Sequence, residues 1–115
     1  MEYPVQITLR GIPHSATLER FIGDEARKLD RVCDRIVSCH MIAEALHPPE
    51  RQLFAVRLNL TLPGTEVAVN RDHEADIYMA VRSAFEAARR QLQDHMSRLA
   101  YAGHRLQSGG FTRGK

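Results

Sequence analysis

Arginine is the residue type whose chemistry stands out in this chain. Lys and Arg together number 16, fourteen of them arginine, while the formal net charge is only +2. The planar guanidinium group can bind phosphate through two hydrogen bonds and can stack on bases, so the composition permits a nucleic-acid partner. It does not require one, because a GC-rich genome also favours arginine codons.

Several arginines lie in the segment DIYMAVRSAFEAARRQLQDHMSRL, residues 76–99, which has the periodicity of an amphipathic helix. At about 100° per residue, its apolar side chains fall within roughly one third of the circle. An ion pair between Glu86 and Arg90, four residues apart, is expected on the polar side. The cations of this helix, from the edge of the apolar arc round to the opposite side, are Arg82, Arg89, Arg90 and Arg98.

A second basic face is predicted on a helix at residues 16–31. Acidic side chains dilute it, so two interpretations are open: the mixed charge of an ordinary surface helix, or part of a surface that follows phosphate groups. Helical spacing alone does not decide between them. The cations opposite the apolar positions of this helix, or beside them, are Arg20, Arg27, Lys28 and Arg31. The diluting acids are Glu19, Asp24, Glu25 and Asp30.

No residue pattern predicts catalysis or a bound metal. The segment HEAD gathers His73, Glu74 and Asp76, but at the entry to a helix, where a carboxylate serves as a cap. There is no H-x-x-x-H or C-x-x-C spacing for a metal, and no nucleophile elbow or glycine-rich phosphate loop. We therefore predict that the protein is not an enzyme and carries no cofactor and no metal.

The bulk composition is that of one soluble domain. The chain has 115 residues, of which 43% are hydrophobic and 26% charged. No apolar run approaches the roughly 18 residues of a membrane span, and the first residues do not resemble a secretory signal, so a cytoplasmic protein without a membrane partner is expected. The two cysteines, Cys33 and Cys39, are predicted to be reduced and buried.

Hydrophobic periodicity predicts four strands and two helices. Alternation of apolar and polar residues is clearest in LFAVRLNLTL, where Phe54 begins the inward set and Arg57 belongs to the outward set. Ser15 and Asp76 are the expected helix caps, and Pro-Gly at 63–64 suits a type II turn that closes a hairpin. The predicted elements are strand 5–10, helix 16–31, strand 36–45, strand 53–62, strand 65–70 and helix 76–99.

This order, β-α-β-β-β-α, predicts an α+β fold with a four-stranded sheet and both helices packed on one face. Residues 1–102 form the expected domain, and residues 103–115, which lose periodicity and gain glycine, are expected to be a flexible tail. In the predicted strand at residues 36–45, the side chain of Val37 is expected to face inward. The predicted core includes Ile7, Leu9, Phe21, Leu29, Met41, Val56, Leu58, Leu60, Val81, Phe85 and Leu92.

The last helix resembles the bacterial ribosome hibernation factor family, which includes hibernation promoting factor and ribosome-associated inhibitor A. The D-x-Y-x-A-[IV] opening and the later R-Q-L carry the resemblance, and the first helix agrees in LERF, KL and DRI. The likeness covers about residues 4–100. The matching residues are Leu18, Phe21, Lys28, Leu29, Asp34, Arg35 and Ile36, then Asp76, Tyr78, Ala80, Val81, Arg90, Gln91 and Leu92.

The resemblance implies a fold similar to the double-stranded-RNA-binding domain with an added first strand. It also implies binding to the small ribosomal subunit in the decoding channel, where mRNA and tRNA would otherwise lie. Inhibition of translation would then be steric, with helix cations contacting ribosomal RNA phosphates and no covalent chemistry. Among the cations, Lys28 and Arg90 match basic positions of the family, and the others come from the helical wheels.

The chain departs from the family at three positions that are basic in typical members. These positions hold Glu25, Ala87 and Asp94. Each lost phosphate contact would reduce the salt-dependent part of the affinity for RNA.

A second interpretation concerns the sheet face that the helices leave open. It is expected to present His40, Arg57, Asn59 and Asn70. Such a face can bind another protein or pair two copies of this chain, so the alternative function is a regulatory protein-binding module that has lost ribosome binding.

Overall fold

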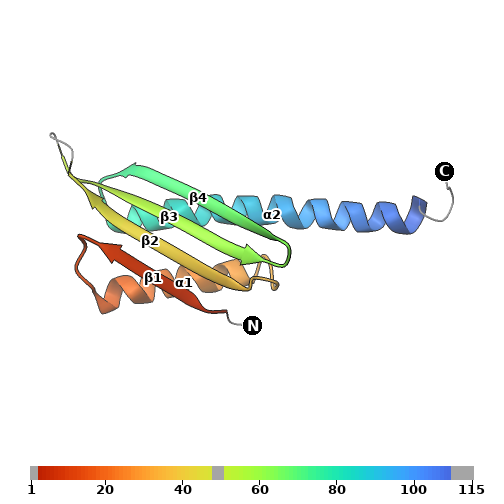
Figure 1. The fold of residues 1–115 in the computed structure, drawn as a ribbon, viewed down its shortest axis with the longest axis horizontal. Helices are drawn as coiled ribbons and strands as arrows, with labels where there is room; N and C mark the ends of the chain where they lie inside the picture. Colours follow the sequence, from red (N-terminus) through yellow and green to blue (C-terminus); the bar gives the residue numbers. More distant parts are fainter. Residues whose placement is uncertain (1–2, 48–50, 110–115) are drawn as a thin grey trace.

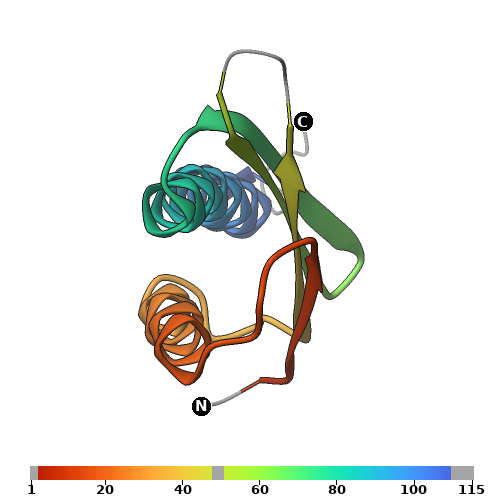
Figure 2. The same ribbon diagram turned by 90° about the vertical axis from the view of Figure 1, so that its left-hand side faces the viewer.

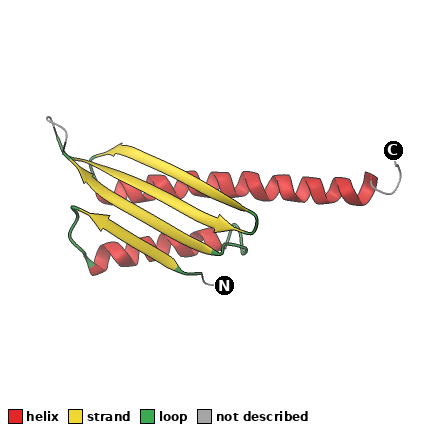
Figure 3. Ribbon diagram, in the orientation of Figure 1, coloured by secondary structure: helices red, strands yellow, loops and turns green. Residues whose placement is uncertain are grey.

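The computed structural model describes residues 3–47 and 51–109 of the chain and has the predicted order of elements. Figure 1 shows a sheet with the two helices running along it, and Figure 3 shows the same arrangement by secondary structure. The elements are β1 (Val5–Arg10), α1 (Ala16–Asp30), β2 (Ser38–Leu46), β3 (Leu53–Leu62), β4 (Thr65–Glu74) and α2 (Ile77–Gly109).

The four strands form one mixed sheet in the order β1-β2-β3-β4. β1 pairs parallel to β2, with Ile7 opposite Met41, because α1 carries the chain back to the starting edge of the sheet. β2, β3 and β4 form an antiparallel meander, as predicted. The turn between β3 and β4 contains Gly64 with φ of 78°, a conformation that favours glycine, so the turn expected at Pro-Gly is confirmed.

Both helices cover the same face of the sheet, and the other face is open (Figure 2). Each helix begins where its cap was predicted. The Ser15 hydroxyl accepts a hydrogen bond from the Leu18 amide at 3.2 Å. Asp76 Oδ1 accepts hydrogen bonds from the amides of Tyr78 at 2.7 Å and Met79 at 3.2 Å. These oxygens bind N–H groups that have no partner within the first turn of a helix.

The core lies between the helices and the sheet, and it contains most of the predicted residues. Ile7, Leu9 and Phe21 are half-buried and pack against this core. Ile7 and Leu9 are only half-buried because β1 is at the edge of the sheet. The inward orientation predicted for Val37 is wrong, because this residue precedes β2 and is 53% exposed. The predicted residues that are fully buried are Leu29, Met41, Val56, Leu58, Leu60, Val81, Phe85 and Leu92.

Two elements are longer than predicted. β4 continues to Glu74 instead of ending at Asn70, and a register shift between Phe54 and Val56 accommodates the extra pairing. α2 continues through Gly109, so the first part of the expected tail is helical, and Figure 1 shows this helix extending past the end of the sheet. Residues 110–115 lie outside the described residues, and the division of the chain at residue 102 stays a prediction.

Both cysteines are free thiols in the core, as predicted. Cys39 lies on the covered face of β2, and burial raises the pKa of its thiol to about 12. In the described part of the chain, no helix combines the length and hydropathy of a membrane span.

Candidate nucleic-acid interface

All eight cations selected from the sequence are exposed to solvent. This agrees with their predicted positions outside the apolar arcs, because α1 and α2 turn their apolar faces toward the sheet. The eight are Arg20, Arg27, Lys28 and Arg31 with α1, and Arg82, Arg89, Arg90 and Arg98 on α2.

A groove between the two helices brings three of these cations together. Lys28 contributes to it from α1, and Arg82 and Arg89 contribute from α2. Leu29 and Phe85, which belong to the core, also line the groove. The structure thus joins cations that are more than fifty positions apart in the sequence. We call this site, which the acids Glu25 and Glu86 also line, the interhelical groove.

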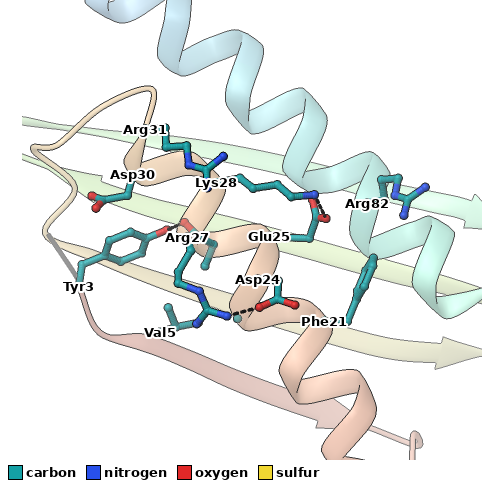
Figure 4. A pocket seen from close by; sticks show the side chains of 12 residues that line it. Tyr3, Val5, Phe21, Asp24, Glu25, Arg27, Lys28, Asp30, Arg31 and Arg82 are labelled. Atoms are coloured by element: carbon teal, nitrogen blue, oxygen red, sulfur yellow. Dashed lines mark hydrogen bonds and ion pairs between the residues drawn. The ribbon is translucent and has the colours of Figure 1, made fainter.

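A second, larger hollow lies along α1 on the side toward β1 (Figure 4). Arg27 and Arg31 line this hollow, and Lys28 and Arg82 line both it and the interhelical groove. Arg20, Arg90 and Arg98 line neither depression. The basic surface therefore has a central part, made of the five residues that line a depression, and three outlying arginines.

Tyr3 fixes the start of the chain against this hollow. Its hydroxyl donates a hydrogen bond to the Ala26 carbonyl at 2.6 Å (Figure 4). Burial raises the pKa of the Tyr3 hydroxyl well above its usual range, and the nearby Cys39 and Asp30 raise it further. Tyr3 thus remains a neutral donor, and sequence reasoning did not single it out.

Only two of the eight cations form ion pairs within the described residues. Arg27 pairs with Asp24, and the Lys28 ammonium lies 3.0 Å from a carboxylate oxygen of Glu25. The ion pair predicted between Glu86 and Arg90 is wrong, since no such contact within 4.0 Å occurs among these residues. The other six cations have no carboxylate partner in the described part of the chain, so their charge is available to an anion.

Glu25 is the acidic residue that lines both depressions of this surface. The helical wheel placed it among the solvated acids, but it is 7% exposed and lines both the groove and the hollow. α2 lies beside this flank of α1 and covers it. Burial of a polar group is costly without a hydrogen-bond partner, and the Lys28 ammonium, which donates to the Glu25 carboxylate at 3.0 Å, is that partner.

The other two departures from the family pattern differ from Glu25. Ala87 is buried in the core, at 7% exposed, so a small side chain suits this position. Asp94 is exposed on α2 and lines neither depression. Of the three departures, only Glu25 therefore places an acidic side chain in the depressions that form the central basic surface.

An aromatic contact joins the helices beside the groove. The Arg82 guanidinium carbon lies over the Phe21 ring, 5.7 Å from the ring centroid. Phe21 in turn makes an edge-to-face contact with Tyr78, with centroids 5.2 Å apart and planes at 76°. Sequence reasoning assigned Phe21 to the core and Tyr78 to the family motif, and it did not link either of them to a cation.

The open face of the sheet is polar and carries both signs of charge. Thr8 and His40 are joined by a hydrogen bond of 3.0 Å, and Arg57 donates to Asn70 at 3.1 Å. A shallow recess on this face is lined by side chains that include Arg10, Glu44, Arg57, Arg71 and Asp72. Acids lie among the arginines in this recess, as Glu25 and Glu86 lie among the cations of the interhelical groove.

The residues of the HEAD segment have local structural roles at the junction of β4 and α2. His73 contacts Asp72 at 3.0 Å, Glu74 ends β4, and Asp76 caps α2. Among the side chains that the structure describes, in residues 3–47 and 51–101, no three His, Cys, Asp or Glu residues are grouped so that they could hold a metal ion.

Two solved structures have a similar fold. A ribosomal subunit interface protein from Coxiella burnetii superposes with a TM-score of 0.68 at 23% identity, covering 82% of this chain and 98% of that one. The N-terminal domain of Protein Y from Thermus thermophilus superposes with a TM-score of 0.64 at 17% identity, covering 81% of this chain and 94% of that one. At these identities the likeness establishes the fold.

A family model identifies the chain more directly. Residues 5–100 match the model described as Sigma 54 modulation protein / S30EA ribosomal protein. Comparison with curated proteins gave no match. The family is non-enzymatic, which agrees with the prediction of no catalysis. The chain belongs to the Sigma 54 modulation protein / S30EA ribosomal protein family, and the resemblance of its helices to the ribosome hibernation factors is confirmed.

Proposed function

We propose that this protein inhibits translation by occupying the mRNA and tRNA channel of the small ribosomal subunit. The basic helix faces bind ribosomal RNA phosphates, and the body of the domain excludes the normal ligands. The observation that carries the proposal is the pair of adjacent cationic helices on one sheet face, in a chain of a ribosomal protein family. Six of the eight cations have no carboxylate partner among the described residues.

The physical argument is electrostatic. Each arginine that neutralises a phosphate releases condensed counterions from the RNA, so affinity depends steeply on salt. A planar guanidinium also binds phosphate oxygens through two N–H groups, which favours arginine over lysine at such contacts. The partner is ribosomal RNA of the small subunit, which would place the protein in the cytoplasm, and the proposed period of action is stress or stationary phase.

Binding to purified small subunits, measured over a range of KCl concentrations, tests the role of the arginines. In the double variant Arg89→Ala/Arg90→Ala, affinity should fall and the log–log salt slope should flatten by about one unit per lost phosphate contact. The fold should persist, because exposed substitutions usually change stability by less than about 0.5 kcal/mol.

A matched control removes the same charge from the other side of the molecule. Arg10→Ala/Arg57→Ala alters two exposed arginines of the open sheet face and should leave subunit binding nearly unchanged. If this control weakens binding as much as the helix variant does, the contact surface is the sheet and the assignment of the helices fails.

Sedimentation of a stationary-phase lysate tests the proposal in the cell. The protein should migrate with small subunits or whole ribosomes in a sucrose gradient. Recovery only at the top of the gradient would contradict ribosome binding.

Pairing of two copies through the open sheet face stays a separate prediction, which sedimentation equilibrium of the purified protein would test.

A further inference from the structure

The contact between Arg82 and Phe21 distinguishes Arg82 from the other cations of the groove. Lys28 is bound to the carboxylate of Glu25. Arg82 instead lies 5.7 Å from the centre of an aromatic ring and has no carboxylate partner among the described residues. Figure 4 shows Arg82 beside Phe21, at the end of the hollow where α1 and α2 approach each other.

A ring and a carboxylate hold a guanidinium in different ways. A carboxylate neutralises the charge and occupies N–H donors. The face of an aromatic ring attracts the cation but leaves its N–H groups free to donate to another acceptor. Arg82 can therefore be held in place while its positive charge and its hydrogen-bond donors remain available.

The orientation of the ring is itself fixed by packing. Phe21 is half-buried against the core and makes an edge-to-face contact with Tyr78, one helical turn before Arg82 on α2. Edge-to-face pairs prefer a definite geometry, so the ring offers a stable face to the guanidinium. A long side chain that is already ordered loses less conformational entropy when it binds.

We infer that Phe21 is a positioning residue that presents Arg82 to a phosphate group at the junction of the interhelical groove and the hollow along α1. The inference rests on the proposed function, since it assumes that the basic helix surface binds RNA. Phe21 itself does not contact the phosphate; it acts by holding the arginine that does.

A double-mutant cycle on binding to purified small subunits tests the inference. The variants are Phe21→Leu, Arg82→Ala and the two combined. Phe21→Leu should weaken binding about two- to fivefold, the range expected for a cation–π contact at an exposed site. In the Arg82→Ala background the same substitution should have no further effect.

Arg98 supplies the matched control, because it is exposed on α2 and makes no ring contact in the described part of the chain. Phe21→Leu and Arg98→Ala should act independently on the affinity for small subunits, so the fold-changes of the two single variants should multiply in the combined variant. Phe21→Tyr retains the ring and should retain wild-type affinity. If Phe21→Leu unfolds too easily for the assay, Phe21→Met replaces the ring with a flexible apolar chain and takes its place in the cycle.

A measurement on the free protein separates this inference from the proposed function. The side-chain protons of Arg82 should show an upfield ring-current shift in the NMR spectrum, and Phe21→Leu should abolish it. If wild-type protein does not bind small subunits, the proposed function is refuted and the positioning role falls with it. If wild-type protein binds but Phe21→Leu and Arg82→Ala have multiplicative effects, or the ring-current shift is missing, the positioning role alone is overturned.

Discussion

Replacement of Glu25 by glutamine should strengthen binding to the small subunit. Glu25 is a buried carboxylate 3.0 Å from the Lys28 ammonium, in the middle of the proposed phosphate-binding surface. A phosphate oxygen bound to the far side of that ammonium would lie roughly 6 Å from the carboxylate, by ordinary hydrogen-bond lengths. The two negative charges then repel each other, and the substitution removes this repulsion.

The size of the effect follows from Coulomb's law. At about 6 Å the repulsion is about 0.7 kcal/mol in water and about 3 kcal/mol at an effective dielectric constant of 20. The Lys28 side chain is 61% exposed, so solvent screens the site and the lower part of this range applies. We expect a gain of about 1 kcal/mol, which is roughly a fivefold increase in affinity.

The substitution should not harm the fold. Glutamine has nearly the shape of glutamate, and a neutral amide is easier to bury than a carboxylate. The ion pair that is lost has an exposed partner and contributes less than about 1 kcal/mol to the free energy of unfolding. Thermal unfolding of the variant should therefore stay close to that of the wild type.

The assay is equilibrium binding to small subunits at several KCl concentrations. With Lys28 released from its ion pair, the log–log salt slope should become steeper by up to about 0.9 units. Asp94→Asn is the matched control, because it removes the same charge from an exposed site outside both depressions. Affinity of the Glu25→Gln variant no greater than that of the control would refute the reasoning.

Three further predictions concern stability. Tyr3→Phe removes the hydrogen bond to Ala26, so the free energy of unfolding in urea should fall by about 1 kcal/mol; an unchanged midpoint would contradict this. Cys39 has a pKa of about 12 when folded and an ordinary value of 9.0, so the unfolded chain loses this proton first as pH rises. Stability should fall between about pH 9 and 12, and less so in Cys39→Ala; equal declines in both proteins would exclude this thiol as the cause. Leu60→Ala opens a cavity at a fully buried position of β3 and should lower the free energy of unfolding by about 2–5 kcal/mol, a loss that the solvent-facing Thr61→Ala should not reproduce.

The order of elements was predictable because it depends on local patterns. A strand with one covered face repeats every two residues, which defined β3 from Leu53 to Leu62 without error. Ser15 and Asp76 marked the helix starts because their oxygens satisfy amides only two or three residues away. The exposure of the eight cations followed in the same way from the helical period, and the family resemblance followed from a short motif on α2.

Contacts between elements were not predictable from these patterns. A helical wheel treats each helix as isolated, so it placed Glu25 on a solvated face, whereas α2 covers that flank of α1 and buries it. The same crossing brings Arg82 over Phe21, sixty-one positions earlier in the sequence. Spacing also suggested the pair Glu86–Arg90, which does not form, because two exposed side chains gain little from pairing in water.

The sequence by itself determined the elements, their caps, the solvated cations and the family, since each depends on residues within about one turn or one strand of each other. The tertiary structure alone decided which cations share a groove, which of them a carboxylate neutralises, and which one an aromatic ring holds. Those outcomes depend on how α1 and α2 lie beside each other on the sheet. That arrangement is set by the packing of the whole core, and no local pattern encodes it.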